Sequence, residues 1–123
     1  MLEKLLANPF AVFREDAVMI MASERCFERV VEIADDINAH LLTDKTGKTP
    51  DTYAQAFLAM ANAGILESAL AKKLVVSVKI RNILVHEYDF EEDYEKFYHS
   101  AKACIPSYGE YCRQIHAYVQ KNF

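Results

Sequence analysis

The feature that most constrains this chain is a long stretch, from about Phe10 to Leu42, in which nothing breaks a helix. It has no glycine or proline, and apolar residues recur along it at steps of three and four: Phe27, Val30, Val31, Ala34, Ile37 and Leu41. This stripe predicts one long helix, started by Asn8 and Pro9, with a kink or a later start near Arg14. Three glycines and three prolines in the whole chain are too few for the tight turns of an all-β fold.

The next segment of the chain predicts a loop followed by a short helix. Thr43–Asp51 is polar and contains a glycine and a proline, which is typical of a loop. Thr52 and Gln55 match a capping box for a helix over Tyr53–Asn62, and Gly64 follows where that helix should end.

Two further helical stretches complete the chain. Glu67–Tyr88 is followed by a second cap-like pair, Asp89 with Glu92, and then by Glu91–Lys121. Proline inside the last stretch predicts a kink or break near Cys104–Pro106. No repeat or linker divides the sequence. We therefore expect a single domain over residues 1–123, an all-α bundle of four or five helices.

Composition and charge exclude several classes of protein. A formal net charge of −4 argues against a protein that coats nucleic acid wholesale, although it leaves room for a local basic cleft. The longest apolar runs, such as Ala17–Ala22 and Leu74–Val78, are too short to cross a bilayer, and the first residues do not resemble a secretory signal. Three cysteines without a CxxC motif suggest reduced thiols in a cytoplasmic protein: Cys26, Cys104 and Cys112.

The stretch Glu67–Tyr88 combines two properties that rarely occur together. Its apolar residues point in every direction around the axis, which is typical of a central helix or a subunit interface. It also carries four positive charges and no acid between Ala69 and Val85: Lys72, Lys73, Lys79 and Arg81. Two interpretations stay open. Either the lysines extend to solvent and the arginine pairs with a carboxylate elsewhere, or these charges serve a site.

A motif at the end of this stretch favours chemistry on a phosphodiester. Arg81 is followed by Asn82, His86 and Tyr88 in the sequence RNILVHEY. Histidine transfers protons near neutral pH, and arginine stabilises charge on a phosphate. RNA supplies its own nucleophile, the 2′-OH, so such a site needs neither a metal nor a cofactor. Asn82 lies four residues before His86 and shares its helix face, where it can orient the imidazole.

The spacing of the motif raises a geometric problem. Five residues of an ideal helix turn by about 140°, so Arg81 and His86 point in different directions. Convergence requires a bent helix end, the reach of the arginine, or a second subunit. We favour a symmetric dimer in which two copies of the motif line one cleft and supply two histidines, one for each proton transfer.

These residues identify a resemblance. From about Arg14 to the C-terminus, the helix order, the Ala63-Gly64-Ile65 turn and the ending RNILVHEY resemble HepT-like toxins of the HEPN superfamily. The signature of that family is R-x4-H-x-Y with a polar residue after the arginine, which Arg81, Asn82, His86 and Tyr88 match. Family members often have a longer first segment than this chain.

The resemblance implies a HEPN-type bundle that dimerises through the helix bearing the motif. It further implies a metal-independent ribonuclease toxin of a type VII toxin–antitoxin system. Arg81 and His86 would be catalytic, Asn82 and Lys79 would bind or orient RNA, and Tyr88 would accept AMP. The implied partner is an MntA-like nucleotidyltransferase antitoxin, which transfers AMP from ATP to that tyrosine. The alternative is a non-catalytic helical module that positions substrate for a nucleotidyltransferase.

Other candidate residues predict only structural roles. Three histidines are expected at the surface or an interface: His40, His99 and His116. Glu32, Asp36 and His40 recur every four residues but lack the Glu-x-x-His pairs of bundle metal sites, so we expect a solvated acidic face. Several tyrosines are expected to pack in the core or at interfaces and not to stack on bases: Tyr94, Tyr98, Tyr108, Tyr111 and Tyr118.

Overall fold

The chain is all-α, as the sequence predicts. The computed structural model describes residues 1–84 and 94–123, apart from the side chain of Tyr94, and these residues form six helices and no strand. Four of them form the bundle, and two short ones precede it. Their bounds are α1 Leu2–Leu6, α2 Phe10–Phe13, α3 Ala17–Thr46, α4 Tyr53–Asn62, α5 Ser68–Asn82 and α6 Tyr94–Asn122.

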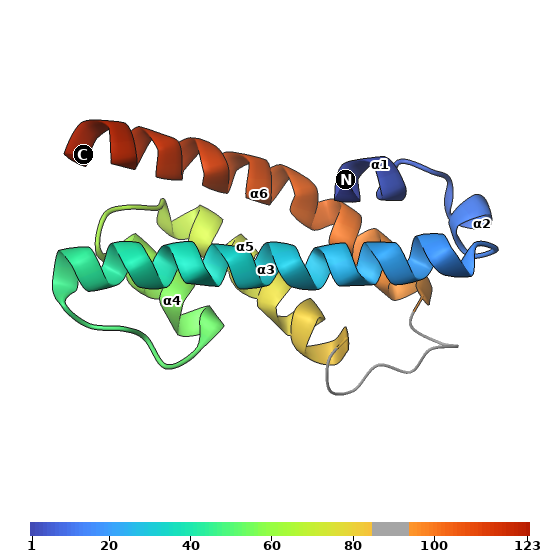
Figure 1. Cartoon of the computed structure of the whole chain (residues 1–123), viewed down its shortest axis with the longest axis horizontal. Helices are drawn as coiled ribbons and strands as arrows, with labels where there is room; N and C mark the ends of the chain where they lie inside the picture. The colour runs from blue at the N-terminus through green and yellow to red at the C-terminus, as the bar shows by residue number, and fades with distance from the viewer. Residues whose placement is uncertain (85–93) are drawn as a thin grey trace.

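Helix α3 is the axis on which the other helices are arranged (Figure 1). Its 30 residues extend for about 45 Å. In the view of Figure 1, α6 lies above it, α4 and part of α5 lie behind and below it, and α1 and α2 lie near its beginning. Helix α5 packs against α3, α4 and α6, which places it centrally.

The long helix has the later start that was expected as an alternative near Arg14, and it does not continue from Phe10. The chain turns between α2 and α3, and α3 begins at Ala17 with Asp16 as its cap, whose side chain accepts from the Met19 N–H at 3.0 Å. The helix is interrupted because a side chain at the end of α2 packs against a different helix, α6. Phe13 is completely buried, and its ring lies 5.0 Å from that of Tyr98 on α6. A straight helix would carry Phe13 away from this contact, so tertiary packing overrides local helix propensity.

Asn8 also differs from its predicted role. It does not cap α2, whose N-cap is Pro9 without a side-chain hydrogen bond. Instead its Nδ2 donates to the carbonyl of Leu5 at 3.2 Å and more distantly to that of Lys4. Asn8 therefore satisfies free carbonyls at the end of α1, a role that is equally available to a short amide side chain.

The boundaries around α4 follow the prediction closely. Helix α4 occupies Tyr53–Asn62, and the Thr52 hydroxyl accepts from the Gln55 N–H at 3.1 Å. Gly64 adopts a φ of +77°, a conformation that glycine tolerates at a helix end. The preceding loop is shorter than predicted, because α3 continues to Thr46.

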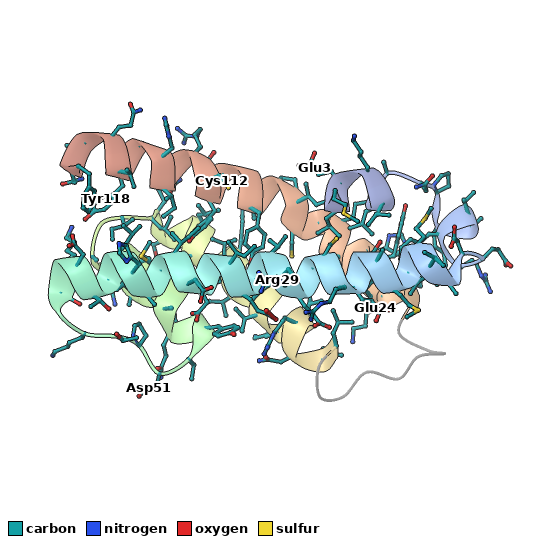
Figure 2. The ribbon with its side chains drawn as sticks, in the orientation of Figure 1. Glu3, Glu24, Arg29, Asp51, Cys112 and Tyr118 are labelled. Carbon is teal, nitrogen blue, oxygen red and sulfur yellow. The ribbon has the colours of Figure 1, made fainter. Side chains whose placement is uncertain are left out.

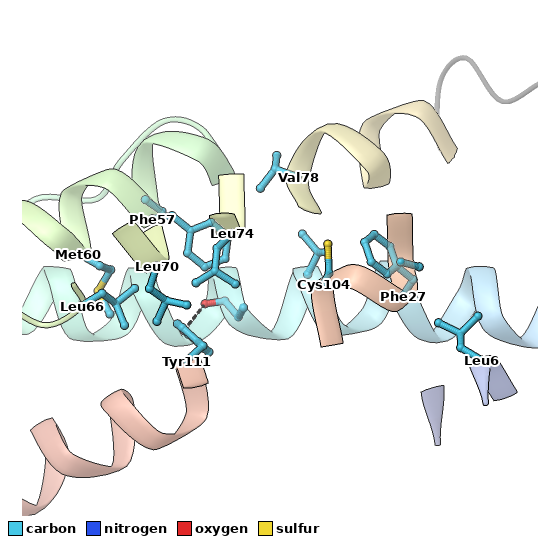
Figure 3. Packing of buried hydrophobic residues seen from close by; sticks show 14 of the residues in the cluster. Leu6, Phe27, Phe57, Met60, Leu66, Leu70, Leu74, Val78, Cys104 and Tyr111 are labelled. Carbon is cyan, nitrogen blue, oxygen red and sulfur yellow. Dashed lines mark hydrogen bonds between the residues drawn. The ribbon is translucent and has the colours of Figure 1, made fainter. Parts of the chain in front are cut away.

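A kink or a break was expected near Cys104–Pro106, and the structure has no break, because α6 continues through Pro106. Figure 1 shows the α6 ribbon bending along its middle. Pro106 is exposed, so the carbonyl that loses its partner can face water. Beyond it, Tyr111 anchors α6 to α3 in the core (Figure 3): its hydroxyl donates to Asn38 Oδ1 at 2.6 Å and lies 3.2 Å from the Ala34 carbonyl oxygen.

Candidate functional site

Helix α5 has one buried face and one open face. Its buried residues recur at helical spacing: Leu70, Ala71, Leu74, Ser77 and Val78. Lys72, Lys73 and Lys79 are exposed, and Val76 between them is 49% exposed. We call these three lysines the basic strip. None forms an ion pair with another residue that the structure describes. The lysines extend to solvent, as one of the two interpretations expects, while the buried face packs against the other helices.

Arg81 lies in the last turn of α5 and is half-buried. Its Cζ atom lies 5.0 Å from the centre of the Tyr53 ring, at the first position of α4. Its Nη1 atom, at an exposed position, donates to Asn82 Oδ1 at 3.3 Å. Its Nε atom is buried and has no hydrogen-bond partner among the described residues. The guanidinium therefore packs against the Tyr53 ring and retains donors that no described residue uses.

The positive charge of the Arg81 guanidinium acts on the Asp35 carboxyl group of α3. Burial raises the pKa of Asp35, the negative charge of Asp36 raises it further, and the positive charge of Arg81 lowers it in part. Within residues 1–84 and 94–123, Arg81 forms no ion pair. The interpretation in which this arginine is neutralised by a carboxylate therefore has no support in the described part of the chain.

The end of α5 departs from ideal α-helical geometry. Ile83 and Leu84 continue the helix in a wider, π-type turn. Such turns are rare in helices and frequently occur at functional sites. The turn lies inside the motif, between Arg81 and the position of the histidine.

The remaining site residues divide into two groups. Lys79 and Asn82 are exposed on the last turns of α5, next to Arg81. His86 and Tyr88 lie outside the described residues, as does the cap-like pair Asp89 and Glu92. The structure thus positions the arginine half of the motif.

The three histidines and four of the five tyrosines with assigned structural roles have the expected exposure, and the side chain of Tyr94 is not described. His40, His99 and His116 are exposed. Tyr98 and Tyr111 are buried, and Tyr108 and Tyr118 are partly buried. In the described ranges no group of three His, Cys, Asp or Glu side chains is placed to hold a metal ion. All three cysteines are free thiols, and Cys112 is exposed on α6 (Figure 2).

Tyr53 and Asp35 are the neighbours of Arg81 that sequence reasoning missed. Tyr53 stands directly after the capping Thr52, so its place at a helix start was predictable. The contact between Tyr53 and Arg81 was not predictable, because no local sequence pattern pairs residues that lie 28 positions apart. Asp35 is one of several acidic residues along α3, and nothing in the sequence marks it as a neighbour of Arg81.

Comparison with known proteins identifies the family. The model of the HepT-like family, described as "Ribonuclease HepT-like", matches residues 1–115. The chain belongs to the HepT-like ribonuclease family. Its relatives include a protein of Aphanizomenon flos-aquae (strain 2012/KM1/D3) named tRNA nuclease HepT. The two are 34% identical over 100 residues, which make up 80% of this chain and 67% of the relative.

Family membership agrees with the resemblance seen in the RNILVHEY motif. Among the helices that the structure describes, none is long and apolar enough to cross a membrane.

Proposed function

We propose that this HepT-like chain is a metal-independent ribonuclease toxin that cleaves tRNA with Arg81 and His86. The observation that carries the proposal is the Arg81 guanidinium, half-exposed and without an ion pair in the described residues, in a chain of a ribonuclease family. The proposed substrate follows from the name of the relative, a tRNA nuclease.

The proposed chemistry uses the substrate's own hydroxyl group. The 2′-oxygen forms a bond to phosphorus and releases its proton to a neutral imidazole, while the bond from phosphorus to the 5′-oxygen breaks. A protonated imidazole gives its proton to the departing 5′-oxygen. Arg81 donates hydrogen bonds to the phosphate oxygens, which gain charge in the transition state. The products are a 2′,3′-cyclic phosphate and a 5′-hydroxyl.

The wider turn at Ile83–Leu84 supports convergence of Arg81 and His86. If this turn absorbs one residue, five positions rotate the chain as four do in an ideal α-helix, by about 40° and not about 140°. Both side chains would then lie on neighbouring faces. A turn of this kind would serve as the bent helix end that the spacing of the motif requires.

We further propose a homodimer in which two motif helices line one RNA cleft, so that two histidines serve the two proton transfers. A subunit-mixing experiment tests this. Wild-type chains exchanged with an excess of His86→Ala chains should lose most of their cleavage activity, because each mixed dimer keeps only one of the two histidines. Full activity per wild-type chain after subunit exchange, verified with differently tagged chains, would contradict a shared cleft.

Lys79 and Asn82 are proposed to contact the RNA backbone near the scissile phosphate, because both are exposed beside Arg81. A lysine that neutralises one phosphate contributes about 0.7 to the slope of log K against log salt for single-stranded RNA. Lys79→Gln should reduce the slope by about this amount. An unchanged slope would remove Lys79 from the interface.

The proposed antitoxin is an MntA-like nucleotidyltransferase that modifies Tyr88. The tyrosine oxygen attacks the α-phosphate of ATP, a new P–O bond forms, and pyrophosphate leaves as the bond to the β-phosphate breaks. The added negative charge would occupy Arg81 and repel RNA. Mass spectrometry after co-expression should show one or more AMP units on Tyr88 and none in Tyr88→Phe.

The direct test of the proposed function is cleavage of purified tRNA by the full chain. Wild type should cleave, whereas Arg81→Ala and His86→Ala should be at least about 100-fold slower while keeping the wild-type melting temperature. If His86→Ala cleaves as fast as wild type, the assigned roles are wrong. A stable complex with the antitoxin, without modification or cleavage, would favour the non-catalytic module.

A further inference from the structure

The ring of Tyr53 is the best-defined contact of the Arg81 side chain. The guanidinium Cζ lies 5.0 Å from the ring centre, within the range of a cation–π interaction. The ring itself is well fixed. Tyr53 is the first residue of α4, whose start is capped by Thr52. One turn later Phe57 is buried, and its ring contacts that of Tyr111 in the core at 5.9 Å (Figure 3).

A ring holds a guanidinium in a way that suits a phosphate-binding arginine. A carboxylate would occupy two N–H donors in a bidentate pair and compete with a phosphate for them. The face of an aromatic ring attracts the positive charge through its quadrupole and uses no N–H donor. Among the described residues the only hydrogen bond that Arg81 donates is the 3.3 Å contact with Asn82.

We propose that Tyr53 is a positioning residue for Arg81, and that its ring holds the guanidinium at the end of α5 with its donors free for the scissile phosphate. The inference rests on the proposed role of Arg81 in RNA cleavage and adds to it a residue from a different helix. Tyr53 acts through the arginine and is not itself a catalytic group.

The test compares three replacements of Tyr53 in the full chain. Tyr53→Leu removes the ring and should lower kcat for tRNA cleavage by about three- to thirtyfold, with a smaller change in KM. Tyr53→Phe keeps the ring and should stay within about twofold of wild type. Pentafluorophenylalanine at position 53 keeps the size of the ring but reverses its quadrupole, and it should lose activity like leucine.

The matched control is the cation–ring pair at the other end of the bundle. Lys45 Nζ lies 5.5 Å from the centre of the Tyr118 ring. Tyr118→Leu removes a tyrosine from a similar contact and should leave kcat and KM unchanged. The pentafluoro variant keeps the packing volume, so it tests the inference even if Tyr53→Leu fails to fold.

The outcomes separate this inference from the proposed function. If Arg81→Ala is inactive while Tyr53→Leu and the pentafluoro variant cleave like wild type, the positioning role is overturned and the proposed function stands. Equal losses in Tyr53→Phe and Tyr53→Leu would assign the effect to the hydroxyl and also overturn the inference. If Arg81→Ala cleaves normally, the proposed function itself fails.

Discussion

Three cations in the described residues lie over tyrosine rings, Lys45, Arg81 and Lys102, and the first two differ most clearly in their other contacts. Lys45, in the last turn of α3, contacts Tyr118 and donates to the Ala63 carbonyl at 2.6 Å, at the end of α4. Arg81, in the last turn of α5, contacts Tyr53 and has no backbone partner in the described residues. The first cation joins three helices, because it contacts groups of α3, α4 and α6. Arg81, by contrast, keeps N–H donors that no described residue uses.

The surroundings of Lys45 reinforce the difference. Gln114 on α6 accepts from the Glu67 N–H at 2.9 Å, at the start of α5, and donates to Glu110 at 3.0 Å. Glu110 in turn binds Arg113. Polar groups at this end satisfy one another, which is the pattern of a structural site. At the Arg81 end, the buried Nε of Arg81 has no hydrogen-bond partner among the described residues.

The largest expected effect separates the two cations by activity. Arg81→Ala should slow RNA cleavage by at least about 100-fold, because a charge-assisted contact to the transition state is lost. Lys45→Ala should leave cleavage within about twofold of wild type. Both rates are measured on tRNA at saturating substrate. A large loss in Lys45→Ala would show that the two ends are not functionally distinct.

A smaller effect is expected on stability at the Lys45 end. Gln114→Ala leaves the N–H of Glu67 without its partner and should cost about 1–2 kcal/mol in the free energy of unfolding. Urea denaturation measures this change. Gln114→Glu keeps an acceptor oxygen for the Glu67 N–H but places a second carboxylate beside Glu110, so at pH 7 it should lose stability as well. Equal stability of wild type and Gln114→Ala would mean that water replaces the lost hydrogen bond.

Lys45→Met tests the cation–ring contact alone. Methionine keeps an apolar stem over Tyr118 but removes the charge and the hydrogen bond to the Ala63 carbonyl. We expect a loss of about 0.5–1 kcal/mol in unfolding free energy, because the contact is exposed. Thermal unfolding at matched salt detects it. No change would show that the ammonium group contributes nothing to joining the helices.

The smallest effect concerns pH. The hydrogen bonds from Arg113 and Gln114 lower the pKa of Glu110 from 4.5 to about 2. A lowered pKa in the folded state means that this carboxylate contributes stability above about pH 4.5, and that the contribution is lost as pH falls toward 2. Wild type and Glu110→Gln should therefore differ slightly at pH 7 and converge near pH 2, with less difference in high salt. A difference that grows on acidification would contradict this assignment.

The sequence predicted the helices wherever local signals and burial agree. Thr52, Gln55 and Gly64 place α4 because capping groups and glycine act within one turn. The sequence left the start of α3 open between Phe10 and a position near Arg14, because the contact of Phe13 with Tyr98 on α6 is recorded by no local pattern. Asp16 was a usable cap signal, but an unbroken apolar pattern concealed it.

Local sequence signals likewise predicted only part of the candidate site. Arg81 and its motif are readable as residue types at fixed spacing along one helix. The exposure of the basic strip, the contact with Tyr53 and the influence on Asp35 depend on how α3, α4 and α5 pack together. These features can be found only from the three-dimensional structure, because they join residues that are far apart in the sequence.

End-group analysis of tRNA cleaved by the full chain in excess EDTA tests the central claim most directly. If Arg81 and His86 direct attack by the substrate's 2′-OH, wild type should cleave in EDTA and leave 2′,3′-cyclic phosphate and 5′-hydroxyl ends, and His86→Ala should leave the RNA intact. Cleavage that stops in EDTA, or products with 5′-phosphate ends, would contradict it.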